Sequence, residues 1–218
     1  MPLKTPRTTV KRLPKRGRHD FETIAAILDA TFLCHLGFVA EGQPYVIPTA
    51  FGRDGRTLYV HGSAVSRTLK RLTEGVPMCL TATILDGLVL ARSGFHSSMN
   101  YRSAVVLGTA TVVEPDQKIH ALEVISEQIL PGRWAEIRGP SRKELNGTTV
   151  LQIPIEEASA KIRNAPPVVV PVVVTPKRIA GSVVEQVGLR PTSRPGRLDH
   201  PGKTTIGAAR RGDADCVD

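Results

Sequence analysis

The sequence predicts a mainly β fold, in which about seven antiparallel strands form a barrel flanked by short helices. Short apolar or β-branched runs recur through the body of the chain, at the length typical of strands. Turn-forming pairs separate several of them, including Asp-Gly at 54–55 and at 86–87, a strong hairpin signal. Most neighbouring runs are too close in sequence to leave room for a crossover helix, so parallel βαβ winding is disfavoured.

The first half of the body alternates a helix, three strands and a second helix. Asp20 can cap a helix that continues to residue 30, with apolar side chains at helical spacing. The second helix, over 63–74, has similar spacing and is closed by Gly75 and Pro77. Between these helices, strands are expected over 32–40, 44–51 and 57–61.

The second half adds four strands and one helix. The strands are expected over 78–85, 88–91, 104–113 and 148–155. The first two flank Asp86-Gly87 and are therefore expected to form a hairpin. A helix with apolar residues at helical spacing is expected from 115 to 130, before the last strand.

Composition excludes several classes of protein. The chain has 218 residues, of which 41% are hydrophobic, enough for one sizeable core. No apolar stretch approaches the roughly 20 residues of a membrane-spanning helix, and none follows the basic N-terminus as it would in a secretory signal. Cys34, Cys79 and Cys216 are far apart, so neither a disulfide framework nor a CxxC metal site is expected. We therefore expect a cytoplasmic protein with no membrane span and no metal site.

The net charge of +9 lies at the two ends of the chain. Residues 1–19 hold seven Lys or Arg and no acidic residue, whereas residues 20–176 hold 14 basic and 15 acidic residues. A basic arm over 1–18, with no apolar period, is expected to be disordered and to bind nucleic acid or anionic lipid only non-specifically. Residues 166–218 are expected to be a Pro-rich, partly disordered extension, which leaves 19–165 as the folded domain.

The first segment that carries chemistry is a strand end followed by a helix start. His61, Gly62 and Ser63 end the expected strand, and Ser66, Arg67 and Lys70 lie within one turn of the helix that follows. Hydroxyl, guanidinium and ammonium groups at a helix start can converge on a phosphate. The alternative is an ordinary capped helix with a solvated basic face.

The second segment is a polar cluster directly before a buried strand. Asn100, Tyr101, Arg102 and Ser103 precede the run of aliphatic residues that ends at Gly108. Polar side chains at the rim of a barrel can be directed at a ligand. The alternative is a turn that merely begins the strand.

Taken together, these segments resemble the pyridoxamine 5'-phosphate oxidase-like family of FMN-binding split barrels, and within it the nitroimidazole-resistance-type branch. The resemblance extends from about residue 23 to about residue 163. It rests on four pieces in the family's order, at 46–51, 58–63, 95–103 and 158–167. It implies a split β-barrel and a homodimer with two FMN sites at the subunit interface.

The resemblance also implies roles for individual residues. Ile47, Pro48 and Thr49 would line the flavin ring. His61, Gly62 and Ser63 would lie beside the ring and its ribityl chain. The phosphate would be held by Ser66, Arg67 and Lys70, and Tyr101, Arg102 and Ser103 would approach the cofactor from the neighbouring rim. Thr68 stands where the family often has a lysine.

The function that this resemblance implies is that of an FMN-dependent oxidoreductase, with nitroaromatic or similar small electrophiles as candidate substrates. His61 is the best candidate for an acid or base because its pKa lies near neutrality, although a positional role is the alternative. Vitamin B6 oxidation is not expected. The true pyridoxamine phosphate oxidases of this family hold the pyridoxal ring with a C-terminal segment that contains tryptophan, whereas the single tryptophan here, Trp134, lies elsewhere.

Other hypotheses stay open. One is a non-catalytic flavin- or haem-binding protein of the same fold, with His35, His61 or His96 as an iron ligand. The cofactor could accordingly be a deazaflavin or haem in place of FMN. Another is a partner for nucleic acid or a membrane surface through the basic arm.

Overall fold

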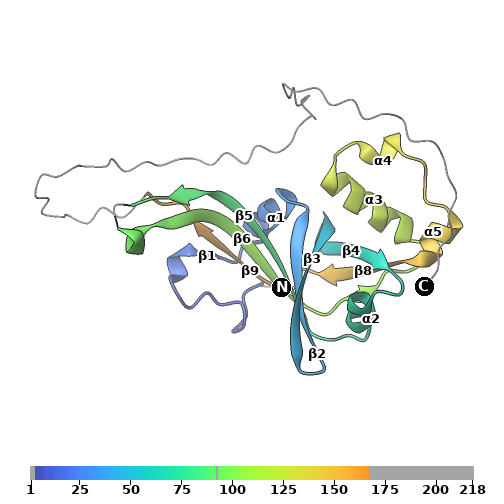
Figure 1. Cartoon of the computed structure of the whole chain (residues 1–218), viewed down its shortest axis with the longest axis horizontal. Coiled ribbons are helices and arrows are strands. Elements are labelled where there is room, and N and C mark those ends of the chain that lie inside the picture. Colours follow the sequence, from blue (N-terminus) through green and yellow to red (C-terminus); the bar gives the residue numbers. More distant parts are fainter. Residues whose placement is uncertain (1–2, 92, 167–218) are drawn as a thin grey trace, which may run out of the picture. The chain divides into compact units, whose positions relative to one another are not determined.

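One antiparallel sheet organises the chain (Figure 1). The computed structural model describes residues 3–91 and 93–166, and in these residues nine strands are ordered β1-β9-β6-β5-β2-β3-β4-β8-β7. The strands are β1 (Gly17–Arg18), β2 (Leu33–Ala40), β3 (Gln43–Asp54), β4 (Thr57–Ser63), β5 (Met78–Val89), β6 (Ser98–Gly108), β7 (Thr111–Val112), β8 (Thr148–Pro154) and β9 (Glu157–Arg163).

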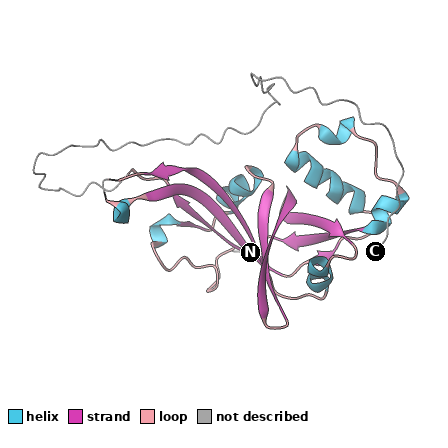
Figure 2. Ribbon diagram, in the orientation of Figure 1, coloured by secondary structure: helices cyan, strands magenta, loops and turns pink. Residues whose placement is uncertain are grey.

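Five α-helices and two short 3-10 turns accompany the described part of the sheet (Figure 2). They are η1 (Pro14–Arg16), α1 (Phe21–Asp29), α2 (Arg67–Thr73), η2 (Gly94–His96), α3 (Lys118–Ile129), α4 (Arg133–Glu136) and α5 (Arg142–Gly147). None of these helices combines the length and apolar character that crossing a membrane would require.

The long strand β3 joins the two halves of the sheet. Its first part pairs with β2, from Gln43 to Ala50, and its last residues pair with β4, from Phe51 to Asp54. The end strands β1 and β7 each pair on one side only among the described residues, so the barrel is split and not closed. The predicted mainly β, antiparallel split barrel is confirmed.

The main core packs against α1 and includes residues from both halves of the sheet, among them Leu58 of β4 and Leu151 of β8. Asp20 caps α1 as predicted, because its carboxylate accepts a hydrogen bond from the Thr23 N–H at 2.9 Å. The apolar face of the helix is buried by tertiary packing. The core includes Ile24, Ile27, Leu28, Leu36, Leu80, Val106 and Ala158.

A second core lies between α3 and the β4–β8 half of the sheet. It contains Tyr59, Val113, Ala121, Ile125 and Val150. The helix sits so close to β3 that a Cβ at Gly52 would lie 2.7 Å from the Val124 carbonyl oxygen. Only glycine leaves room for this approach.

The structure corrects the prediction of a hairpin at Asp86-Gly87. Strand β5 continues through this pair, and the register against β6 shifts between Leu85 and Gly87. A glycine within a strand is typical of such a bulge. Asp86 is engaged there by a bidentate ion pair with Arg102 on β6, at 2.8 Å. The turn lies farther on, around η2.

The N-terminal segment also differs from expectation. Residues 3–18 were expected to be disordered, but β1 pairs with β9, and the Ala158 N–H donates to the Leu3 carbonyl at 3.0 Å. Leu3 is buried, and Arg7 forms an ion pair with Glu157. Backbone pairing, the buried Leu3 and the ion pair of Arg7 together hold this segment on the sheet. The predicted extension after residue 166 lies outside the described residues.

Candidate functional site

The end of β4 and the start of α2 form the predicted strand–turn–helix. Ser66, and not Ser63, caps the helix, because its hydroxyl accepts from the Leu69 N–H. Gly62 allows α2 to pack on the strand end, since a Cβ there would lie 3.1 Å from Leu69 Cδ1. The geometry therefore places the backbone of Gly62, Ser63 and Ser66 next to one another.

Two exposed cations accompany this helix start. Arg67 lies over the Tyr45 ring, with its guanidinium carbon 5.3 Å from the ring centroid. Lys70 is one turn farther along the same face of the helix. Neither makes an ion pair within residues 3–91 and 93–166, whereas Arg71 pairs with Glu41 at 2.6 Å and with Glu74 at 2.9 Å. Arg67 and Lys70 thus remain available to an anion.

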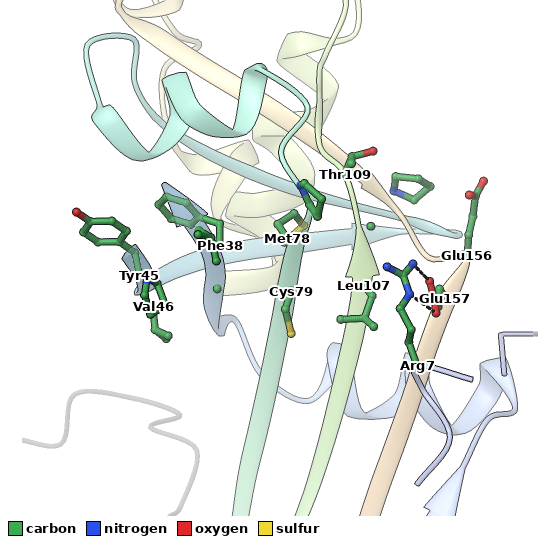
Figure 3. A pocket seen from close by; sticks show the side chains of 16 residues that line it. Arg7, Phe38, Tyr45, Val46, Met78, Cys79, Leu107, Thr109, Glu156 and Glu157 are labelled. Atoms are coloured by element: carbon green, nitrogen blue, oxygen red, sulfur yellow. Dashed lines mark hydrogen bonds and ion pairs between the residues drawn. The ribbon is translucent and has the colours of Figure 1, made fainter. Parts of the chain in front are cut away.

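A hollow of about 650 Å³ is lined by residues of β2, β3, β5, β6 and β9 (Figure 3). We call it the outer hollow; two of its lining residues, Phe38 and Met78, also belong to the main core. Its lining residues include Arg7, Val39, Tyr45, Val46, Cys79 and Leu107. Tyr45 belongs both to this wall and to the contact with Arg67, so the hollow reaches the start of α2 through the Tyr45 ring.

The three site residues predicted on β3 do not share a face. Pro48 is exposed and pairs with His35 of β2, whereas Ile47 packs against the main core and pairs with Leu36. Thr49 follows the alternation of the strand and lies on the same side as Ile47. None of the trio is among the residues that line the outer hollow: Pro48 lies on the side of Val46, and Ile47 and Thr49 lie on the side of Tyr45.

The rim residues of β6 lie far from α2 in one chain. Met78, soon after α2, pairs with Gly108, and Tyr101 lies seven positions farther along β6, about 23 Å at the rise of a strand. Arg102 is engaged by Asp86, and the Ser103 hydroxyl donates to the Lys161 carbonyl at 3.4 Å. Within one chain, the structure does not bring Tyr101, Arg102 and Ser103 to the α2 group.

His61 faces a different cavity from the one expected. The alternation along β4 directs its side chain away from α2 and toward α3, on the side of Tyr59. There it lines a cavity of about 480 Å³, which we call the His61 cavity. Its other lining residues are Leu122, Ile125, Ser126, Ile129, Trp134, Ile137, Arg138, Pro140 and Glu144.

The imidazole of His61 is half-buried, and its Nδ1 has no hydrogen-bond partner among the described residues. Burial lowers the pKa of His61 below its ordinary value of 6.5, because desolvation penalises the cation. The ring is therefore neutral at pH 7. A neutral imidazole that lines a largely apolar cavity can serve as a metal ligand.

Sequence reasoning missed the wall of this cavity. The segment after α3 contains α4 and α5, neither of which was predicted. A signal was present, because Ser141 and Glu144 form a capping box at the start of α5. The other two candidate histidines lie elsewhere: His35 is exposed on β2, and His96 in η2 stacks edge-on against Phe95.

Comparisons with known proteins agree with this fold. The model of the family described as pyridoxamine 5'-phosphate oxidase matches residues 20–162. A search of curated protein sequences gives no match.

Several solved structures are similar to the chain. The FAD and haem binding protein from Mycobacterium smegmatis is 38% identical, with a TM-score of 0.69 over 71% of this chain and 77% of that one. The flavocytochrome Anf3 from Azotobacter vinelandii is 37% identical, with a TM-score of 0.72 over 89% and 95% of the two chains. A proposed 5-nitroimidazole antibiotic resistance protein from Bacteroides thetaiotaomicron is 25% identical, with a TM-score of 0.57 over 67% and 86%.

Proposed function

Because the chain belongs to the pyridoxamine 5'-phosphate oxidase family, we propose that it is a redox protein that binds a flavin at α2 and haem in the His61 cavity. The observation that carries the proposal is the half-buried, neutral His61, which lines a largely apolar cavity and whose buried Nδ1 has no hydrogen-bond partner within the described residues. The similarity to a FAD and haem binding protein and to a flavocytochrome supports the pairing of the two cofactors.

The residues of the His61 cavity fit haem. Haem iron can be held by a neutral imidazole, and His61 would provide one. Leu122, Ile125, Ile129 and Trp134 offer the apolar walls that a porphyrin needs and would exclude water from it. When bound, the haem supplies one-electron chemistry. The chain's own part is to ligate the iron, to fix the ring between β4 and α3, and to keep the site dry.

The α2 region fits the phosphate of a flavin. Arg67 and Lys70 provide two cations without ion pairs in the described residues, and Ser66 adds a hydroxyl. The outer hollow, which begins at Tyr45, has room for a ring system beside them. FMN and FAD share the phosphate next to the ribityl chain, so these contacts suit both. FMN, the flavin expected from sequence, is smaller than FAD and needs fewer contacts from this surface.

A homodimer would complete the flavin site. Tyr101, Arg102 and Ser103 lie at the opposite end of β6 from α2 in one chain, so their approach to the same cofactor requires a second copy. The outer face of β2 and β3 is apolar, with Val39 54% and Val46 66% exposed. An exposed apolar surface of this kind is typical of an interface between subunits.

We propose an oxidoreductase in which Arg67 and Lys70 would hold the flavin and His61 would hold the haem, and the two cofactors would supply the redox chemistry. The similarity to the nitroimidazole-resistance protein keeps small nitroaromatic electrophiles as the candidate substrate class. The flavin would carry the hydride chemistry, while Arg67 and Lys70 hold its phosphate. A protein that only carries the two cofactors is the alternative.

The absorption spectrum of the purified protein, with haem and flavin supplied during expression, tests this function. Flavin bands and a Soret band are expected, and reduction of the flavin by a nicotinamide donor should be followed by reduction of the haem. Chromatography of the released flavin distinguishes FMN from FAD and from a deazaflavin. A colourless protein that takes up neither cofactor would contradict the proposal.

A further inference from the structure

The cavity that contains His61 has one permanent cation among its lining residues, Arg138. Its guanidinium makes a two-point ion pair with Glu144: Nη1 donates to Oε2 at 2.8 Å and Nη2 donates to Oε1 at 2.6 Å. Nη1 also donates to the Gly139 carbonyl at 3.1 Å. The terminal edge of the guanidinium is therefore fully engaged.

Glu144 is itself fixed in place. It belongs to the capping box of α5, where its Oε2 accepts from the Ser141 N–H at 2.7 Å. Hydrogen bonds from Arg138 and from Ser141 hold the pKa of the Glu144 carboxyl well below its usual range. The carboxylate stays charged at neutral pH and fixes the plane of the guanidinium.

The second edge of the Arg138 guanidinium has no acceptor within residues 3–91 and 93–166. This edge consists of Nε–H and the remaining N–H of Nη2, which point in parallel. Two parallel N–H donors match the two oxygens of a carboxylate. The lining of the cavity thus combines apolar side chains, the imidazole of His61 and the guanidinium of Arg138 with two N–H donors that are free within the described residues.

We propose that Arg138 binds a carboxylate of the ligand in this cavity, and that Glu144 is the positioning residue that holds Arg138 for it. The inference rests on the proposed haem site and deepens it, because haem has an apolar ring and two propionates at one edge. Arg138 would then select an acidic porphyrin over a neutral one, while His61 binds the iron.

The Arg138–Glu144 ion pair contributes little to the stability of the fold. The two side chains are 71% and 49% exposed, and ion pairs with that exposure contribute little to stability. Replacing Arg138 should therefore leave the fold intact. Arg133 provides a matched control, because it pairs with Glu136 at 3.1 Å in the neighbouring α4 but does not line the cavity.

The test compares haem with haem dimethyl ester, which lacks the propionate charges, by optical titration of the full chain. The unaltered protein should bind haem about 10- to 100-fold more tightly than the ester, the range expected for hydrogen bonds to a charged group. Arg138→Gln should remove this preference, and Arg138→Lys should restore part of it. Arg133→Gln should keep the full preference, and Glu144→Gln should reduce it.

A metal-free porphyrin separates the two roles. Binding of protoporphyrin IX, measured by fluorescence, should weaken in Arg138→Gln and stay unchanged in His61→Ala. Equal binding of haem and its ester to the unaltered chain would overturn the role of Arg138 and leave the haem site standing. An unchanged preference in Glu144→Gln would overturn its positioning role. Failure of the unaltered chain to bind any of these porphyrins would overturn both the inference and the haem part of the proposed function.

Discussion

Gly52 of β3 lies directly against the backbone of Val124 in α3, so that a Cβ at residue 52 would come within 2.7 Å of the Val124 carbonyl oxygen. This contact fixes the position of α3 against β3, and α3 supplies Leu122, Ile125 and Ile129 to the lining of the His61 cavity. The shape of the cavity therefore depends on a glycine that does not line it.

Gly52→Ala should destabilise the protein by about 1–3 kcal/mol, the usual cost of forcing a methyl group into a packed contact. The obstacle is backbone and not a flexible side chain, so the helix must shift. Urea unfolding followed by circular dichroism measures the change. Gly55→Ala is not a neutral comparison because its φ is positive, but Gly108→Ala, with open space around it, should cost far less.

In the cofactor-free protein, acidification should lower the free energy of unfolding because of His61. Burial lowers the pKa of His61 in the folded state below the 6.5 of the unfolded chain. As the pH falls below 6.5, the unfolded state therefore takes up the proton first, and stability is lost until the folded-state pKa is passed. His61→Gln should show a flatter dependence of unfolding free energy on pH over this window. Parallel curves for the two proteins would contradict the assignment.

The two cysteines in the described residues should differ in reactivity. Burial raises the pKa of the Cys34 thiol to about 12, so its thiolate is scarce and inaccessible in the folded protein. Cys79 is only partly buried and lies on the wall of the outer hollow (Figure 3). Iodoacetamide should modify Cys79 first, as read by peptide mass spectrometry, and added flavin should slow that modification.

Flavin binding should depend on the two cations at α2. Arg67→Gln and Lys70→Gln should each weaken binding of FMN by about tenfold, because each removes a charged hydrogen-bond donor to the phosphate. Arg71→Gln is the control, since Arg71 is engaged by Glu41 and Glu74. Riboflavin, which lacks the phosphate, should bind all four proteins alike. A loss of riboflavin binding in the Arg67 variant would point to damage of the ring site instead.

Local signals predicted the parts of the fold that depend on short stretches of chain. Asp20 caps α1, and the step from β4 to α2 lies where the His61–Lys70 segment indicated. Asp86-Gly87 was misread because the same pair suits a hairpin turn and a bulge, and only pairing with β6 decides between them. The docking of residues 3–18 on β9 depends on contacts between distant segments, such as Arg7 with Glu157, which no local pattern reveals.

The candidate site was predicted in part for the same reason. The residues of the α2 start could be grouped from the sequence because they are neighbours along the chain. His61 was assigned to the flavin by its position beside Gly62, yet strand alternation turns it to the other face. The walls of its cavity include residues of α4 and α5, which come 72 to 86 residues after His61 in the chain. Only the folded chain brings those walls to the histidine.

Haem uptake by His61→Ala tests the central claim most directly. The unaltered protein, titrated with haem, should develop a Soret band of axially ligated iron, and His61→Ala should lose that ligation signature while His35→Ala and His96→Ala keep it. Magnetic circular dichroism or resonance Raman spectra report the axial imidazole. An unchanged ligation signature in His61→Ala would contradict the account, as would its loss in His35→Ala or His96→Ala alone.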